Sequence, residues 1–283
     1  DSDANVAVGY SALGSETLGQ YNTALGYNSL ATQNSTTATN SYNTAVGFSS
    51  GFSVTTGTFN TLVGGLAGDA ITTGTRNIAV GYNALGADTL GSKSVAVGLG
   101  TLADQNFTTA TDAFNTAVGH GAGTAITTGT LNTLLGGLTG DALTTGTDNT
   151  ALGMAALGND TKGNKAVAVG EGALHNQNFT TSTDNYNVAV GFDAGNDITT
   201  GTQNTIVGGV AGDALTTGTD NIAIGFTALS SDTKGNKTTA IGRTALLSQN
   251  FTTSTDTYNV AVGYDAGRNV TTGVQNTIIG ALA

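Results

Sequence analysis

The sequence predicts an all-β chain folded as a parallel β-solenoid of about 15 to 16 coils, and three observations lead to this class. A glycine closes an A-V-G-like hexapeptide in steps of 17, 21, 17 and 17 along the chain, and this 72-residue cycle then repeats. No proline, cysteine or tryptophan interrupts the pattern, and no change of composition divides the chain. Short regular repeats are typical of solenoids, in which each coil stacks on the previous one. We therefore expect residues 1–283 to form a single repeat domain.

Each hexapeptide predicts one strand per coil. The repeat glycines that close the hexapeptides are Gly9, Gly26, Gly47, Gly64, Gly81, Gly98, Gly119, Gly136, Gly153, Gly170, Gly191, Gly208, Gly225, Gly242, Gly263 and Gly280. Ala stands two positions before the glycine in 12 coils, and large aliphatic or β-branched residues flank it. Strand side chains alternate between faces, so the bulky residues share one face and Ala and Gly the other. We expect the bulky face to line the inside of the coil and the bare face to point outward.

A second glycine follows ten positions after the repeat glycine in the short coils, as at Gly57 and Gly74. In the four long coils its place is taken by Asn40, Asp112, Asp184 and Asp256. Gly, Asn and Asp are the residues that best tolerate a left-handed backbone. The substitution pattern therefore predicts a turn with positive φ at this position.

The long coils carry a four-residue insertion, which reads N-Q-N-F-T-T-S-T-D at 176–184. Close copies stand at 104–112 and 248–256, and the earliest, around residues 33–40, lacks the Phe. We expect these segments to bulge from one side of the coil. Aromatic rings flanked by amides are suited to contact a sugar, although Phe107 could equally plug the coil below. The candidate receptor or glycan contacts are Asn106, Phe107, Asn178, Phe179, Asn250 and Phe251.

A narrow coil buries few large side chains, whereas ordering each residue costs roughly 1–2 kcal/mol. Packing the bare Ala/Gly face against other copies would bury more surface, so we expect a homotrimer. The predicted interface residues are Ala24, Ala45, Leu62, Ala79, Ala117, Leu134, Ile206 and Ile278. Gly280 and Gly9 are consecutive in the cycle of steps, which also predicts continuation into further coils or stacking of copies end to end.

Composition and motifs exclude several classes of function. A net charge of −11 argues against nucleic-acid binding, and no apolar run is long enough to span a membrane. Catalysis needs residues that break the repeat, but His120 and His175 occupy unrelated coil positions and no catalytic or phosphate-binding motif occurs. We expect no enzyme and no cofactor. Recurring carboxylates such as Asp69 and Asp88 fit turns that bond their own backbone, with a calcium ladder as the alternative.

The N-T-A-V-G-Y and N-V-A-V-G hexapeptides resemble the N-S-V-A-I-G repeats in the heads of trimeric autotransporter adhesins of the YadA type. They are still more similar to N-T-A-V-G-Y-N-A-L repeats of bacteriophage tail fibres and bacterial surface fibres. The resemblance covers residues 5–280. It implies a left-handed parallel β-roll, assembled as a parallel homotrimer at the bacterial cell surface or in a virion tail fibre. Both the short and the long coils of this chain are longer than the usual coil of the adhesin heads.

The leading hypothesis is an extracellular structural and adhesive fibre segment that attaches to a cell-surface glycan or protein. Ice binding is an alternative, because Thr-x-Thr pairs such as Thr56-Gly57-Thr58 recur and would stack on a solenoid. The pairs are interrupted by Leu90-Gly91-Ser92 and by the long coils, whereas an ice plane needs an unbroken face. A third alternative is a self-assembling extracellular filament without a ligand.

Overall fold

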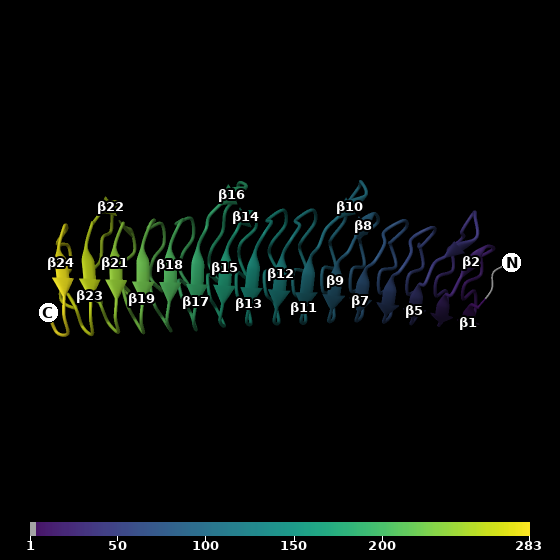
Figure 1. The fold of residues 1–283 in the computed structure, drawn as a ribbon, viewed down its shortest axis with the longest axis horizontal. Coiled ribbons are helices and arrows are strands. Elements are labelled where there is room, and N and C mark those ends of the chain that lie inside the picture. The colour runs from purple at the N-terminus through teal and green to yellow at the C-terminus, as the bar shows by residue number, and fades with distance from the viewer. Residues whose placement is uncertain (1–3) are drawn as a thin grey trace. The chain divides into compact units, whose positions relative to one another are not determined.

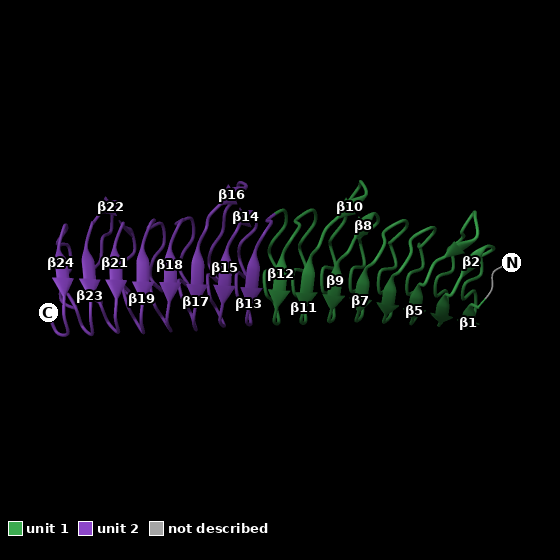
Figure 2. Cartoon of the chain, in the orientation of Figure 1, with its two compact units in different colours: residues 1–145 green, residues 146–283 purple. Residues whose placement is uncertain are grey.

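The computed structural model describes residues 4–283, and those residues form strands and turns without any helix. The chain divides into two compact units, residues 1–145 and 146–283 (Figure 2). Each unit is a parallel β-solenoid with one main strand in each of its eight turns. The predicted all-β solenoid class and the predicted number of coils are confirmed.

The main strands of the first unit form a parallel sheet in chain order, drawn as successive arrows in Figure 1. They are β1 (Val6–Val8), β3 (Thr23–Leu25), β5 (Thr44–Val46), β6 (Thr61–Val63), β7 (Ile78–Val80), β9 (Val95–Val97), β11 (Thr116–Val118) and β12 (Thr133–Leu135). Those of the second unit are β13 (Thr150–Leu152), β15 (Val167–Val169), β17 (Val188–Val190), β18 (Thr205–Val207), β19 (Ile222–Ile224), β21 (Thr239–Ile241), β23 (Val260–Val262) and β24 (Thr277–Ile279).

Each long coil adds a short strand that pairs in parallel with the coil before it. The pairs of the first unit are β2 (Gly19–Gln20) with β4 (Thr39–Asn40), and β8 (Gly91–Ser92) with β10 (Thr111–Asp112). Those of the second unit are β14 (Gly163–Asn164) with β16 (Thr183–Asp184), and β20 (Gly235–Asn236) with β22 (Thr255–Asp256). Figure 1 shows β10 and β16 standing out beyond the turns next to them, so the insertions form the predicted bulges.

The strand register reproduces the spacing of the repeat. Ile78 of β7 pairs with Val95 of β9 across a short coil, and Val95 pairs with Thr116 of β11 across a long one. Equivalent side chains of successive coils therefore stack directly on one another. A feature that recurs in sequence becomes a continuous column in the structure.

The predicted orientation of the strand faces is wrong. Ala79 has no exposed surface, whereas its neighbour Ile78 is 40 % exposed. Large side chains from the opposite wall of the coil, such as Ile71 and Leu85, are fully buried and fill its interior. They leave room for only a small side chain from the strand, so the β-branched residues point outward. Ala24, Ala45, Leu62, Ala79, Ala117, Leu134 and Ile206 all lie inside the coil, at most 1 % exposed, and are not available to neighbouring copies.

The strands with a large inward residue compensate for glycines on the opposite wall. A Cβ atom on Gly51 or Gly68 would lie 2.7 Å from a Cδ atom of Leu62. In other coils the equivalent corner position holds a leucine, such as Leu30 or Leu85, and the strand contributes Ala. Leu62 therefore fills the volume that a corner leucine fills elsewhere. The same exchange places Leu134 opposite Gly123 and Gly140.

The repeat glycines form a column in which only glycine fits. Gly64 has φ +136°, and a Cβ atom on it would lie 2.5 Å from the carbonyl oxygen of Gly81 in the next coil. The second glycine is required for a different reason from the predicted one, because Gly57 is absent from the positive-φ residues. A Cβ on Gly57 would instead lie 2.5 Å from the carbonyl oxygen of Gly74. Close stacking, and not a left-handed turn, selects glycine there.

A ladder of buried asparagines ties each coil to the next. Asn60 donates from Nδ2 to the carbonyl of Gly74 (2.9 Å), and its Oδ1 accepts the backbone N–H of Asn77 (3.0 Å). Asn77 repeats the first contact with Gly91 at 2.9 Å, and neither asparagine has any exposed surface. Buried polar groups need hydrogen-bond partners, and this ladder supplies them to the backbone at the start of each strand. The recurring Asn therefore has a structural role.

Candidate functional site

The bulges hold their aromatic residues inside the fold and not on the surface. Phe107, Phe179 and Phe251 are only 5 %, 5 % and 7 % exposed. A Cβ atom on Gly163 would lie 2.9 Å from Cδ2 of Phe179, so the ring covers the glycine of the preceding coil. The prediction that these rings are exposed sugar contacts is wrong, and the plug that was the alternative for Phe107 describes all three. Their neighbours Asn106, Asn178 and Asn250 are exposed.

Each long coil rests on a buried carboxylate of the coil before it. Asp88 accepts the Nε2 hydrogen of Gln105 at 2.6 Å through Oδ2, and the backbone N–H of Gly91 (3.0 Å) and Phe107 (3.3 Å) through Oδ1. Gln105 in turn accepts from Nδ2 of Asn115 at 2.9 Å. The carboxylate, the amide and the asparagine ladder thus form one network. The bond from Gly91 agrees with the predicted turn role of Asp88.

The same network recurs in all four long coils. The three other copies of the network are Asp160–Gln177–Asn187, Asp232–Gln249–Asn259 and, in the first long coil, Glu16–Gln33–Asn43. The glutamines were not among the predicted site residues. The available signal was that a Gln recurs in each long coil, 17 positions after an acidic residue of the preceding short coil.

The pKa values of two of these carboxyl groups are shifted in opposite directions from their ordinary values. Burial raises the pKa of Asp88 above its ordinary value of 3.8, and its hydrogen bonds offset burial only in part. Burial also opposes ionisation of Glu16, but hydrogen bonds from the backbone of Gly19 and Ser35 and from Gln33 outweigh it. They lower the pKa of Glu16 below its ordinary value of 4.5.

An ion pair joins three of the bulges to the preceding coil. Lys93 lies 2.6 Å from Asp112, and Lys237 lies 2.6 Å from Asp256; the third pair is Lys165 with Asp184. A hydrogen bond from Lys237 lowers the pKa of Asp256. These pairs are exposed to water, which screens them, so they orient the bulge more than they stabilise it.

The outer face of each main sheet carries rows of exposed apolar side chains. Around β7 the alternation is strict: Arg76, Ile78 and Tyr82 are exposed, whereas Asn77 and Ala79 are buried. Every main strand contributes the same outward positions. Exposed large side chains on this surface of the first unit are Val6, Val8, Tyr10, Tyr21, Leu25, Tyr27, Tyr42, Phe48, Phe59, Ile78, Tyr82, Leu99, Phe114, Leu131 and Leu135. Those of the second unit are Leu152, Met154, Tyr186, Phe192, Ile222, Phe226, Tyr258, Tyr264 and Ile279.

Aromatic side chains border this outer sheet face in stacked columns. The rings of Tyr10 and Tyr27 lie 5.3 Å apart between centroids, and those of Tyr27 and Phe48 5.6 Å apart, with interplanar angles of 14° and 7°. On the other border, Tyr21 and Tyr42 stack at 5.1 Å. Because neighbouring rings cover one another's faces, the columns present mainly ring edges. Such a surface suits apolar packing better than the face-on stacking of a sugar.

The Thr-x-Thr pairs form separate patches. Thr56 and Thr73 are exposed in consecutive coils, whereas Thr55 and Thr72 donate from Oγ1 to the backbone of the next coil, at 3.2 and 3.0 Å. The following coil carries Leu90-Gly91-Ser92, and the next one carries a bulge. The exposed threonine rows are therefore two coils deep.

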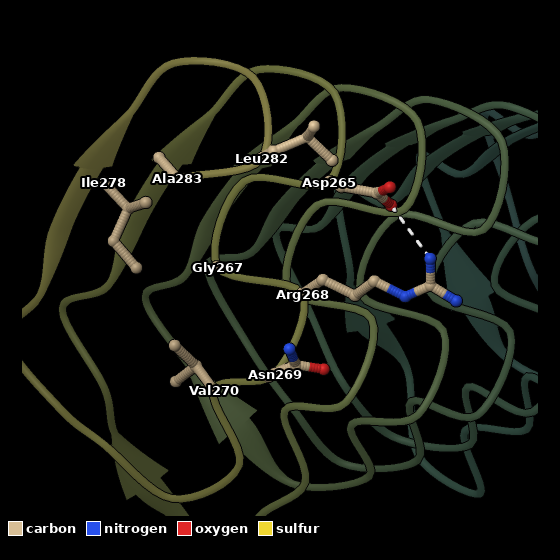
Figure 3. A pocket seen from close by; sticks show the side chains of 8 residues that line it. All are labelled: Asp265, Gly267, Arg268, Asn269, Val270, Ile278, Leu282 and Ala283. Atoms are coloured by element: carbon tan, nitrogen blue, oxygen red, sulfur yellow. Dashed lines mark hydrogen bonds and ion pairs between the residues drawn. The ribbon is translucent and has the colours of Figure 1, made fainter.

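Two hollows lie in the second unit. One, of about 530 Å³, opens on the last coil between Val270, Ile278 and Leu282, with Asp265 and Arg268 paired at its rim at 3.5 Å (Figure 3). Ile278 is half-buried there, so this last predicted interface residue also belongs to the coil interior. The other, of about 210 Å³, is lined by residues including Met154, Glu171, His175, Phe192 and Asp193.

The histidines and recurring aspartates do not gather into a metal-binding cluster in the described part of the chain. His120 is exposed, and Nδ1 of His175 lies 3.0 Å from the carbonyl of Ala155. Burial raises the pKa of Asp213, and the charges of Asp197 and Asp193 add to this. Between residues 4 and 283, no three His, Asp or Glu side chains are placed to hold a metal ion.

The same described residues include no helix that is long and apolar enough to cross a membrane. Comparisons of the whole chain gave no match to a protein-family model, to a curated protein or to a solved structure. The functional interpretation of the chain therefore depends on its own geometry.

Proposed function

We propose that this chain is a segment of an extracellular structural fibre that associates as a homotrimer through the outer sheet face. The apolar side chains along the outer face of each main sheet, exposed on some strands and half-buried on others, carry the proposal. Tyr10, Tyr27 and Phe48 are 72 %, 48 % and 57 % exposed, which for these three rings alone amounts to roughly 300 Å² of apolar surface. Contiguous apolar patches larger than a few hundred Å² mark interaction sites in soluble proteins.

The fold itself supports a mechanical role. Backbone pairing, the glycine column and the asparagine ladder repeat from coil to coil, so each unit has a uniform construction. The resemblance to surface-adhesin and tail-fibre repeats supports a location at a bacterial cell surface or in a virion tail fibre, and a left-handed coil. The interface that we propose differs from the Ala/Gly face, because that face lies inside the coil.

Sedimentation of the purified chain tests the trimer. Ile78→Asp places a charge on the outer sheet face and should shift the trimer towards monomer, because an unpaired charge is costly to bury. Thr73→Asp, on an exposed position away from the main strands, is the matched control and should sediment as the parent chain does. A parent chain that is a monodisperse monomer would overturn the proposed assembly.

We propose that attachment, where the fibre is adhesive, uses the exposed tips of the bulges, such as Thr180, Thr181 and Ser182. Replacing these three residues by Gly-Ser-Gly retains Phe179 and the buried network. Retention of the assembled chain on a glycan array or on cells should then fall. If the parent chain is retained neither on the glycan array nor on cells, the alternative of a filament without a ligand is favoured.

Ice binding is the second candidate, and the exposed pairs of threonine rows are the observation that favours it. Thermal hysteresis of the purified chain tests it directly. Because each patch is only two coils deep, we expect no measurable hysteresis. A clear hysteresis in the parent chain that is lost in Thr56→Leu would favour ice binding over the structural fibre.

A further inference from the structure

The bulges carry Asn-x-Ser/Thr tripeptides, whose geometry is independent of the proposed trimer and of adhesion. Seven Asn-x-Ser/Thr tripeptides occur in the chain, which is the pattern of N-glycosylation acceptors. Their asparagines are Asn34, Asn106, Asn159, Asn178, Asn236, Asn250 and Asn269. Four of the seven, Asn34, Asn106, Asn178 and Asn250, are spaced by one full cycle of the repeat and occupy the same position in the four long coils.

The structure gives these four asparagines one common geometry. In Asn106 the backbone N–H donates to Thr127 of the next coil at 2.9 Å, and the side-chain Oδ1 accepts from Thr89 of the preceding coil at 2.9 Å. The acceptor side of the amide is thus fixed. The other three Oδ1 atoms accept from Thr17, Thr161 and Thr233 at 2.8, 3.0 and 3.2 Å.

The nucleophilic side of the amide is left open. All four asparagines are exposed, and within residues 4–283 their Nδ2 atoms donate none of the hydrogen bonds that the structure records. By contrast, Nδ2 of Asn159 donates to Asn176 at 3.0 Å. Asn236 is 8 % exposed, and its Nδ2 donates to Ser254 at 3.0 Å. Exposure together with an unused amide nitrogen therefore separates the bulge tripeptides from these two. Asn269 is exposed as well, but it lies in a short coil, and among the residues that the structure describes no recorded hydrogen bond fixes its Oδ1 as in the bulges.

The buried residue in the middle of the tripeptide determines that the asparagine and the threonine on either side of it face solvent. Phe107 points into the coil, so its neighbours Asn106 and Thr108 are both exposed, as alternation along an extended segment requires. Ser35, 5 % exposed, takes the place of the ring in the first long coil. The hydroxyl that completes the acceptor pattern therefore stands outside together with the amide.

We propose that Asn34, Asn106, Asn178 and Asn250 are acceptors for an asparagine-linked hexose, delivered from a nucleoside-diphosphate sugar by a glycosyltransferase. In that transfer a bond forms between Nδ2 and C1 of the sugar, and the bond from C1 to the diphosphate oxygen breaks. The nucleoside diphosphate leaves with the bonding electron pair, and the enzyme's base takes the amide proton. The chain then carries one sugar on the bulge of each long coil.

The test uses the folded full-length chain with UDP-glucose and a soluble N-glycosyltransferase that recognises Asn-x-Ser/Thr. Intact mass should show hexose additions, and peptide mapping should place them on the four bulge asparagines at rates at least tenfold above Asn159 and Asn236. Asn106→Gln should remove one addition. Thr108→Val should remove the same addition while it leaves the acceptor atom in place.

The denatured chain is the matched control, because unfolding exposes every tripeptide equally. Addition to Asn236 should rise on denaturation, whereas addition to Asn178 should not depend on it. A folded chain that gains no hexose at the bulges while the denatured chain does would overturn the proposal. Equal rates at Asn178 and Asn236 in the folded chain would overturn it as well.

Discussion

The carboxylate of Asp88 and the side-chain amide of Gln105 meet at 2.6 Å in the coil interior, where neither residue has any exposed surface. The contact joins a short coil to the long coil that follows it, and it lies beneath the plug of Phe107. A buried carboxylate is tolerated only with such partners. The bulge is therefore built on a polar network that joins the asparagine ladder inside the coil.

Breaking this contact should destabilise the first unit. Gln105→Met keeps the volume but leaves Oδ2 of Asp88 without a hydrogen-bond partner, which costs about 1–3 kcal/mol for a buried unsatisfied group. Nδ2 of Asn115 keeps its bond to the carbonyl of Gly129. Urea unfolding measures the change. Asn106→Ala, at the exposed neighbouring position, is the control and should cost less than about 1 kcal/mol; an equal loss in both variants would contradict the role of the network.

Acidification should weaken the contribution of Glu16 to folding stability and strengthen that of Asp88. The pKa of Glu16 is lowered in the folded chain, so its stabilising contribution is present above pH 4.5 and is lost as the pH falls through the folded value. The pKa of Asp88 is raised, so its contribution is present below pH 3.8 and is lost as the pH rises through the folded value.

The measurement is the urea midpoint between about pH 3 and about pH 7. Glu16→Gln should remove part of the loss of stability on acidification. Asp88→Asn should make that loss steeper, because the opposing contribution is gone. Parallel curves for the parent chain and both variants would contradict the two assignments.

The glycine column should tolerate no side chain. Gly64→Ala puts a Cβ 2.5 Å from the carbonyl oxygen of Gly81 at φ +136°, so we expect strain of at least about 1–3 kcal/mol and separation of the two coils. Gly65 is the adjacent control, because its φ is not positive and a Cβ would lie 3.5 Å from Tyr82, an ordinary contact. Thermal unfolding should distinguish the two variants, and equal effects would show that the close approach is not decisive.

Removing a plug should loosen its bulge. Phe179→Ala deletes a ring that is 5 % exposed, and comparable truncations cost about 3–5 kcal/mol. Hydrogen exchange in residues 180–184 should become faster, since this segment follows the lost anchor. Phe192→Ala, which removes a ring that is 55 % exposed and lies outside the bulge, should leave the exchange of the bulge nearly unchanged.

A charge at the small strand position should unfold the coil and not only separate copies. Ala79 has no exposed surface and pairs in register with Ala96, so Ala79→Glu buries a carboxylate without a partner. Circular dichroism should show loss of β-structure at protein concentrations where Ile78→Asp remains folded. A folded, dissociated Ala79→Glu chain would restore the view that this face points outward.

The sequence by itself determined the solenoid, the strand positions and the register. Periodicity sufficed because every coil repeats the same backbone pairing, so the spacing of Gly64 and Gly81 in sequence equals one turn in space. The insertions also revealed the bulges, since four additional residues in one coil have no equivalent position in the next.

Only the tertiary structure decided which face points inward. Alternation separates Ala79 from Ile78 but is symmetric between inside and outside. The choice depends on the volume left by Leu85 and Ile71, which arrive from the other wall of the coil. The same limit explains Phe179, because an aromatic ring in an insertion can cover the neighbouring coil or face solvent. The glycine of that coil, Gly163, leaves the space that the ring occupies.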